Sequence, residues 1–283
     1  MVEIFYSNGF FGEVPVRHSV IWFINAGFDN IELSSGIVQK EDLKFLKKIK
    51  ASGRKIRLHN YFPSFDSKFV MNLASSNKDT REQTRNLIFN ALEWSIELGS
   101  DYYAFHSGFL FDPEPTELRG NLQSHELSCY FEAKNRFKEQ LLIISDRAQE
   151  LGVNIAVENN VYDFMNYQRY KDMVPFLGVC EHNIHELLIG GVGLLLDFGH
   201  LKVSATTLSE DYYRICKIWL PHATGFHLSD NNGLSDDNKS FDESAWFIEF
   251  IEDQRNNITI EVNERDPKIL RNLGSIVQNA LVK

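Results

Sequence analysis

Eight short apolar segments alternate with segments of helical periodicity, and this alternation constrains the fold more than any other feature of the sequence. The apolar segments predict strands at Glu3–Ser7, Phe28–Ser35, Ile56–His59, Asp101–Ser107, Val153–Asn160, Gly193–Asp197, Thr224–Asp230 and Ile258–Asn263. The intervening segments predict helices at Val14–Ala26, Lys40–Ser52, Thr80–Leu98, Tyr130–Leu151, within Tyr167–Leu188, and at Glu210–Trp219, Ser244–Glu252 and Pro267–Leu281.

Strands that alternate with helices pair in parallel through βαβ units. Eight such units in 283 residues predict a (β/α)8 TIM barrel, with residues 1–283 forming a single domain. A doubly wound open sheet is the alternative. Its nucleotide-binding form would place a GxGxxG turn after the first strand, and the segment Asn8–Gly12 lacks that pattern.

Composition narrows the class of protein further. A net charge of −10 argues against a general basic surface for nucleic acid, although a bound metal could supply positive charge locally. The 3 cysteines are isolated, so neither a disulfide framework nor a cysteine-type zinc site is predicted. No apolar run approaches about 18 residues, and no secretory signal pattern opens the chain, so we expect a cytoplasmic protein outside the membrane. A homo-oligomer is compatible with the sequence.

The strongest functional signal lies at the ends of the strands. The buried run Gly193–Asp197 ends in a carboxylate, and an imidazole follows three residues later. From the second strand onward, the strand ends carry Glu32, His59, His106, Glu158, Asp197 with His200, His227 with Asp230, and Glu261. Because the carboxyl ends of barrel strands meet at one face, these side chains are predicted to converge.

Four of these residues predict a metal site: Glu158, Asp197, His227 and Glu261. They come from four consecutive strands and bring three carboxylates together, with no Arg or Lys at the strand ends to neutralise them. Buried charge of this kind is costly, and a divalent cation is the simplest compensation. Nitrogen and oxygen ligands without a thiolate suit Zn²⁺, Mn²⁺, Co²⁺ or Mg²⁺.

The remaining residues near strand ends also have structural interpretations. A single histidine there is more often a hydrogen-bonded packing residue, and a single carboxylate often caps the next helix. For Glu32 the structural and functional interpretations carry equal weight, whereas Asp230 fits better in an Asp-Asn-Asn-Gly turn. The aromatic residues Tyr61, Phe62 and Phe109 are candidates for a pocket wall or for the core.

Four segments carry a resemblance to a known family: Val157–Asn159, Asp197–His200, His227–Gly233 and Ile260–Glu261. They resemble the xylose-isomerase-like TIM-barrel superfamily, which contains sugar isomerases and epimerases, related dehydratases, and the endonuclease IV (AP endonuclease family 2) group. The resemblance covers essentially the whole chain. In the isomerase and epimerase branch, it implies that His200 contacts substrate and that one divalent metal is bound by Glu158, Asp197, His227 and Glu261.

The endonuclease branch supplies an alternative. The segment Glu97–Gly108 resembles the endonuclease IV pattern, and His59 and His106 match two histidines that hold a first zinc there. They are therefore candidates for a second metal. A third zinc in that branch needs an Asp-x-His after the seventh strand, whereas this sequence has Asp236-Asp-Asn238. The resemblance thus implies one or two metals rather than three.

The leading hypothesis is a divalent-metal-dependent isomerase or epimerase of a sugar or sugar-like hydroxycarbonyl compound. Glu158 and Glu261 would remove and return a C–H proton, while the metal stabilises the enediolate formed in between. Substrate would be held by His200, Glu32, His59 and His106, and the last two could instead hold the second metal.

Two alternatives stay open. One is a zinc-dependent, endonuclease IV-like phosphodiesterase whose partner would be abasic DNA. The other is a catalytically inactive barrel that only binds metal. A phosphate on the substrate would need basic groups near the last strands, and Lys202, Lys239 and Arg265 are available, although solvated surface charge is their simpler interpretation.

Overall fold

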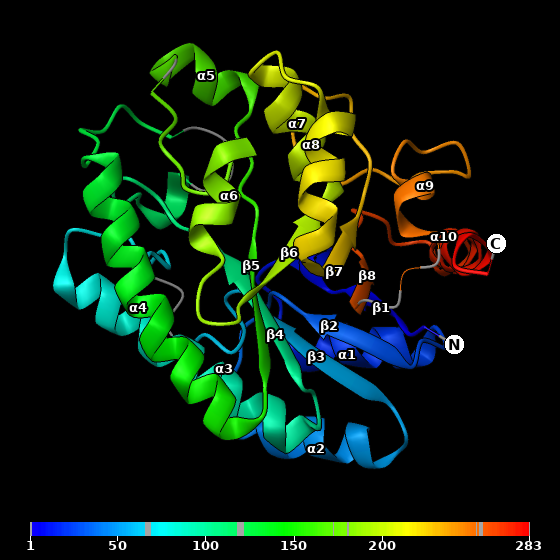
Figure 1. Ribbon diagram of the computed structural model, residues 1–283. Coiled ribbons are helices and arrows are strands. Elements are labelled where there is room, and N and C mark those ends of the chain that lie inside the picture. The colour runs from blue at the N-terminus through cyan, green and yellow to red at the C-terminus, as the bar shows by residue number, and fades with distance from the viewer. Residues whose placement is uncertain are drawn as a thin grey trace.

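The computed structural model describes residues 2–65, 69–117, 122–171, 173–179, 181–252, 254 and 257–282. Within these residues, parallel strands close into a barrel in sequence order (Figure 1). The strands are β1 (Ile4–Ser7), β2 (Asn30–Leu33), β3 (Lys55–His59), β4 (Tyr102–His106), β5 (Asn154–Glu158), β6 (Gly193–Asp197), β7 (Ala223–Leu228) and β8 (Asn257–Ile260). The (β/α)8 barrel predicted from the sequence is therefore confirmed.

Helices surround the barrel and cover its outer face (Figure 1). They are α1 (Val16–Asn25), α2 (Asp42–Ala51), α3 (Lys78–Leu98), α4 (Tyr130–Leu151), α5 (Phe164–Tyr170), α6 (Glu181–Leu187), α7 (Phe198–Thr207), α8 (Tyr212–Trp219), α9 (Ile248–Ile251) and α10 (Pro267–Ala280). Among the described residues, no helix combines the length and apolarity needed to cross a bilayer.

Helix α7 is the element that the sequence analysis missed. It begins directly after β6, because Oδ1 of Asp197 accepts the backbone N–H of His200 and so caps the helix. Gly199 lies inside this helix. A Cβ there would lie 2.5 Å from Oγ of Ser229, so glycine serves a close approach between α7 and the end of β7.

Two further predictions differ in detail from the structure. The helix expected within Tyr167–Leu188 is two short helices, α5 and α6, and the chain between them makes an antiparallel bridge from Phe176 to Phe109. The helix expected at Ser244–Glu252 is confined to the single turn of α9. Both differences lie in connections between strands, so the barrel itself is unaffected.

In the barrel interior, a few large side chains pack against small ones. Tyr102, Ala104, Ala156 and Leu195 form a buried cluster, and they alternate along their strands with residues that pack outward against the helices. Gly225 faces this cluster from β7. A Cβ at Gly225 would lie 2.4 Å from the hydroxyl oxygen of Tyr102, so the tyrosine occupies space that only glycine leaves open.

The irregular excursion expected at Phe109–Ser128 builds a second apolar cluster beside the barrel mouth. Its buried members are Phe111, Leu122, Tyr162, Tyr170, Phe176 and Val179. Glu117 ties the excursion together, because its carboxylate accepts the backbone N–H groups of Glu114 and Gln123 and lies 2.9 Å from Nε2 of His125. This cluster supplies one wall for the pocket described below.

Candidate metal centre

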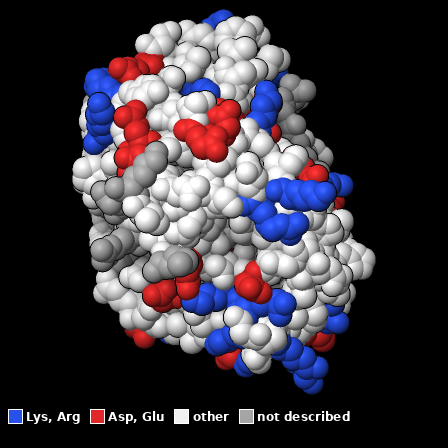
Figure 2. Space-filling model, turned by 90° about the vertical axis from the view of Figure 1, so that its right-hand side faces the viewer, with Lys and Arg blue, Asp and Glu red and all other residues white. Residues whose placement is uncertain are grey.

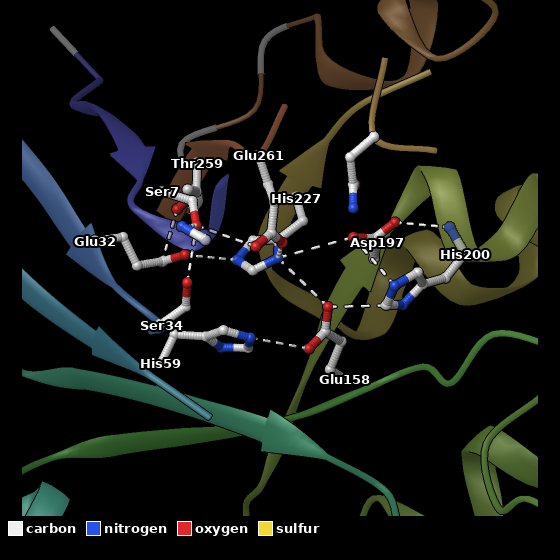
Figure 3. Close-up of polar contacts among 12 residues, drawn as sticks. Ser7, Glu32, Ser34, His59, Glu158, Asp197, His200, His227, Thr259 and Glu261 are labelled. Carbon is white, nitrogen blue, oxygen red and sulfur yellow. Dashed lines mark hydrogen bonds and ion pairs between the residues drawn. The ribbon is translucent and has the colours of Figure 1, made fainter. Parts of the chain in front are cut away.

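The strand ends bring most of the predicted residues together at the mouth of the barrel. His106 pairs with Glu158 across β4 and β5, and Asp197 pairs with His227 across β6 and β7. Neighbouring strands in register present these side chains to the same interior space, and Figure 3 shows Glu158, Asp197 and His227 together there. Except for Glu32 and Asp230, every strand-end residue identified in the sequence belongs to this group.

His227 lies at the centre of the four residues predicted as metal ligands. Its Nδ1 atom lies 2.6 Å from Oε2 of Glu261 and 3.4 Å from Oε1 of Glu158. The same nitrogen lies 3.8 Å from Oδ2 of Asp197. Ligand atoms of all four residues lie within 4.8 Å of one another. This spacing suits a single cation held between three carboxylates and one imidazole.

The burial of these atoms supports a cation at this position. Glu158, Asp197 and His227 are at most 1% exposed. Both carboxylate oxygens of Glu158, Oδ2 of Asp197 and Nδ1 of His227 have no aligned hydrogen-bond partner in the described structure. Buried polar atoms without partners are costly, and a divalent ion beside His227 would satisfy Oε1 of Glu158, Oδ2 of Asp197 and Nδ1 of His227 at once. The residues present therefore fit a metal.

The shifts in pKa within the cluster follow from burial and close charges. Burial raises the pKa of Asp197 to about 7, because desolvation outweighs the attraction of His200. Burial also acts to raise the pKa of Glu158, but the charges of His106 and His59 outweigh it and hold this pKa well below its ordinary value. Burial lowers the pKa of His106 to about 4. An ionised Glu158 and a neutral His106 are in the protonation states that metal ligands need. For His227, burial acts to lower the pKa, but the charges of Glu32 and Glu261 outweigh it and hold the pKa well above its ordinary value, so this imidazole would release a proton on binding a metal.

Two histidines converge on the other oxygen of Glu158. Nε2 of His59 lies 3.2 Å from Oε2 of Glu158, and Nδ1 of His106 lies 3.4 Å from the same atom. These are the residues that the sequence suggested for a second metal. The arrangement leaves room for Glu158 to be shared between two positions, one beside His227 and one beside His59 and His106.

His200 is fixed on both sides of its ring. Nδ1 lies 2.8 Å from the backbone oxygen of Asn159, and Nε2 lies 3.3 Å from Oδ2 of Asp236. Asn238 contributes no imidazole here, and its amide nitrogen lies 3.5 Å from the same oxygen of Asp236. His200 therefore faces a carboxylate at the edge of the pocket.

Asn159 is a further residue of the site that was not predicted as functional from the sequence. Its side-chain oxygen accepts the backbone N–H of Asp197 at 2.8 Å, and its amide donates to the backbone oxygen of Asp197 at 3.1 Å. These two hydrogen bonds join the ends of β5 and β6 and orient Asp197. Its position directly after Glu158 was the one feature of the sequence that could have indicated a role in the site.

Glu32 lies below the cluster rather than beside the pocket. It is 2% exposed, and it contacts Arg57, Thr259 and His227. This placement argues against the expected role in holding substrate hydroxyls, because both of its oxygens already face protein groups. Arg57 was overlooked because it stands inside β3 rather than at the strand end. Two residues before His59, it points into the same interior.

A pocket of about 510 Å³ opens beside the cluster. It meets the cluster at His106 and His200, and its wall includes Asn60, Tyr61, Phe109, Asn160, Asn166, Phe176 and Asp236. Tyr61 and Phe109 thus line the pocket, as one of their two interpretations expected, whereas Phe62 is buried in the main core. The volume is in the range of small-molecule sites.

The basic residues near the last strands are engaged elsewhere. Lys202 binds Asp230 at 2.6 Å, which also fits the turn interpretation of Asp230, and Lys239 pairs with Asp237 at 2.9 Å. Arg265 donates to the backbone oxygen of Phe10. The described pocket lining contains no Lys or Arg. On the face drawn in Figure 2, blue and red side chains are interspersed rather than gathered into one basic surface.

Residues 22–268 match the profile of the family described as the xylose isomerase-like TIM barrel. Among solved structures, the chain is similar to a D-tagatose 3-epimerase-like protein at 21% identity, with a TM-score of 0.73 and 99% of each chain covered. It is also similar to an L-ribulose 3-epimerase at 13% identity, with a TM-score of 0.67 and 99% and 96% of the two chains covered.

Endonuclease IV from Thermus thermophilus is similar as well, at 14% identity, with a TM-score of 0.60 and 99% and 98% of the two chains covered. At these sequence identities, the similarity shows a common fold and does not distinguish the isomerase and epimerase branch from the endonuclease branch. No curated protein is significantly similar to the sequence.

Proposed function

Because the chain belongs to the xylose isomerase-like TIM-barrel family, we propose that it is a divalent-metal-dependent isomerase or epimerase of a sugar or sugar-like hydroxycarbonyl compound. One observation carries the proposal. A pocket of about 510 Å³ reaches the cluster at His106 and His200, which lie 3.4 and 3.7 Å from carboxylate oxygens of Glu158, and its described lining combines aromatic and amide side chains and lacks Lys and Arg. Such a lining suits an uncharged polyhydroxy compound better than a phosphodiester.

The metal would be held by Glu158, Asp197, His227 and Glu261, and the donor set suits Zn²⁺, Mn²⁺, Co²⁺ or Mg²⁺. When bound, it supplies electrostatic stabilisation of the negative charge that develops on substrate oxygens as a C–H proton leaves. Oε1 of Glu158 and Oδ2 of Asp197, which are buried and have no aligned hydrogen-bond partner among the described residues, support this assignment.

Glu158 and Glu261 would move the proton. Oε1 of Glu158 and Oε2 of Glu261 both lie near Nδ1 of His227, so the two carboxylates flank the same position. Oε1 of Glu261 accepts a hydrogen bond from Ser7 at 3.0 Å, which fixes the orientation of this carboxylate. Glu261 is also the more exposed of the pair, with 20% of its side chain accessible. One carboxylate takes the proton and the other returns it.

Histidines would orient the substrate. His200 and His106 both line the pocket, and their rings stack with centroids 5.6 Å apart. His200 would bind a substrate hydroxyl at its Nε2 edge, next to Asp236. His59 and His106 would position the substrate or hold the second metal beside Glu158.

A second candidate, a zinc-dependent phosphodiesterase that cleaves abasic DNA, is favoured by one observation. His59 and His106 converge on one oxygen of Glu158, and that arrangement could hold a second metal. Against it, Asn238 stands where the endonuclease pattern has an imidazole.

One experiment separates the candidates. Metal-loaded protein is incubated in deuterated water with a panel of unphosphorylated ketoses and aldoses, and in parallel with an abasic DNA duplex. We expect deuterium at the carbon next to a carbonyl for at least one sugar, no strand cleavage, and loss of exchange with a chelator. Strand cleavage without exchange would select the phosphodiesterase. Metal binding with neither activity would indicate an inactive barrel.

A further inference from the structure

We propose that Glu32 is a positioning residue that fixes which ring nitrogen of His227 carries the proton, and so leaves the other nitrogen free to bind metal. The inference rests on the proposed metal centre, although not on the reaction proposed for it. It replaces the expected contact between Glu32 and substrate with a role inside the barrel.

His227 stands between one carboxylate on one side and three on the other (Figure 3). On one side, Nε2 lies 2.9 Å from Oε1 of Glu32. On the other side, Nδ1 faces Glu158, Asp197 and Glu261. The histidine is 0% exposed, so water does not compete for either nitrogen. The protonation of the ring is therefore decided by these two sets of neighbours.

Glu32 is held as an ionised carboxylate by residues from β3 and β8. Nε of Arg57 donates to Oε2 of Glu32 at 3.0 Å, and the hydroxyl of Thr259 donates to the same oxygen at 2.7 Å. Oε2 is thus saturated, and Oε1 is the atom presented to His227. The guanidinium of Arg57, 3.0 Å from Oε2 and buried with it, supplies the positive charge that keeps this carboxylate ionised.

Arg57 is itself firmly placed. It donates to the backbone oxygen of Ile258 and to the hydroxyl of Thr259, and its guanidinium lies 4.1 Å from the centre of the Phe5 ring. The strand register brings these four residues together inside the barrel. Glu32 pairs with Arg57 across β2 and β3, and His227 pairs with Thr259 across β7 and β8. The network therefore belongs to the rigid barrel rather than to a loop.

An ionised carboxylate only accepts hydrogen bonds, so the nitrogen that faces Glu32 must carry the proton. A neutral imidazole has one N–H, which leaves the lone pair on Nδ1. Without Glu32, the proton would move to Nδ1, where Oε2 of Glu261 lies 2.6 Å away and would accept it. A protonated Nδ1 cannot bind metal. Glu32 thus selects the tautomer that makes His227 a ligand.

The test uses Glu32→Gln and the double variant Glu32→Leu/Arg57→Met. The double variant avoids leaving the Arg57 charge buried without a partner, which could unfold a single Glu32→Leu protein. Asp42→Asn is the matched control, because Asp42 is also a buried carboxylate paired with an arginine, Arg17, but lies on α2 outside the barrel.

Two quantities are measured on each protein without substrate. The zinc dissociation constant is obtained by competition with a chromophoric chelator, and the ¹⁵N shifts of labelled histidine report which nitrogen of His227 is protonated in the zinc-loaded protein. We expect Nε2–H in the wild type. The dissociation constant should rise about 10–100-fold in the double variant, rise less in Glu32→Gln, whose amide oxygen still accepts from Nε2–H, and stay unchanged in Asp42→Asn.

A folded double variant that binds zinc within twofold of the wild type would overturn the inference, as would Nδ1–H in the zinc-loaded wild type. A wild-type protein that binds no zinc would remove the metal centre and the inference together. Zinc binding with the expected variant pattern but no C–H exchange on any sugar would overturn the proposed reaction and leave the role of Glu32 supported.

Discussion

Asp197 and His200 are joined by a 2.7 Å hydrogen bond, in which the backbone N–H of His200 donates to Oδ1 of Asp197. This bond caps α7 and uses only one of the two carboxylate oxygens. The other oxygen, Oδ2, faces the imidazole of His227 and has no aligned hydrogen-bond partner among the described residues. One oxygen of this side chain therefore caps a helix, and the other stays available for the proposed metal.

The two roles of Asp197 can be separated by substitution. Asn keeps an oxygen that can cap α7 but removes the charge, whereas Ala removes both. We expect Asp197→Ala to be less stable than Asp197→Asn by about 1 kcal/mol in metal-free protein, measured by denaturant unfolding. Zinc titration should show binding weakened at least about tenfold in both variants, because a charged ligand is lost. Wild-type zinc affinity in Asp197→Asn would contradict the assignment of Oδ2 as a ligand.

The raised pKa of Asp197 predicts a pH dependence of stability in metal-free protein. Its pKa is about 7 in the folded chain, against an ordinary value of 3.8, so the folded state binds more protons between these values. Stability contributed by this group is therefore present at acid pH and lost as the pH rises toward 7. The free energy of unfolding of the wild type, relative to Asp197→Asn, should fall as the pH rises from about 4 to 7. A flat difference would show that burial does not perturb this carboxyl.

Asn238 offers a test of the missing third metal. Its backbone φ is 47°, a conformation that histidine also tolerates, and it lies beside Asp236, which contacts His200. Asn238→His would complete a set of two imidazoles and one carboxylate. We expect native mass spectrometry to count one more zinc ion per chain in this variant than in the wild type, and no gain in Asn238→Ala. An unchanged zinc count in Asn238→His would mean that His200 and Asp236 are not directed at a common position.

The packing of Tyr102 against Gly225 predicts a stability effect away from the metal. Because a Cβ at residue 225 would lie 2.4 Å from the tyrosine hydroxyl, Gly225→Ala should destabilise the protein by about 1–3 kcal/mol in denaturant unfolding. Adding Tyr102→Phe removes the clashing oxygen and should recover part of the loss. No recovery would place the strain in the backbone of β7 instead.

The barrel and the convergence of its strand-end side chains could be predicted because both depend on local patterns. Apolar runs end in Glu158, Asp197 or His227, and parallel strands bring their ends together without further information. Helix α7 could not be predicted in the same way, since Gly199 is a weak helix former and its purpose, close contact with Ser229, exists only in the folded chain.

The groups that orient the ligands were harder to predict, because their partners are distant in sequence. Glu32 and Thr259 hydrogen-bond across 227 positions, and nothing local to either residue indicates the contact. Arg57 could have been assigned to the interior from its alternation with His59, but its partner depends on the register between β2 and β3. The pattern of strand ends therefore identifies the proposed ligands but not the residues that contact them from inside the barrel.

The most direct test of the account is deuterium incorporation by metal-loaded wild type and Glu158→Gln, using the sugar that the exchange panel identifies. Each protein is first shown to contain metal, so that loss of a ligand is not mistaken for loss of a base. The account predicts exchange at the carbon next to the carbonyl in the wild type, reduced about 10²–10⁴-fold in Glu158→Gln. Metal-loaded Glu158→Gln that exchanges at the wild-type rate would contradict it.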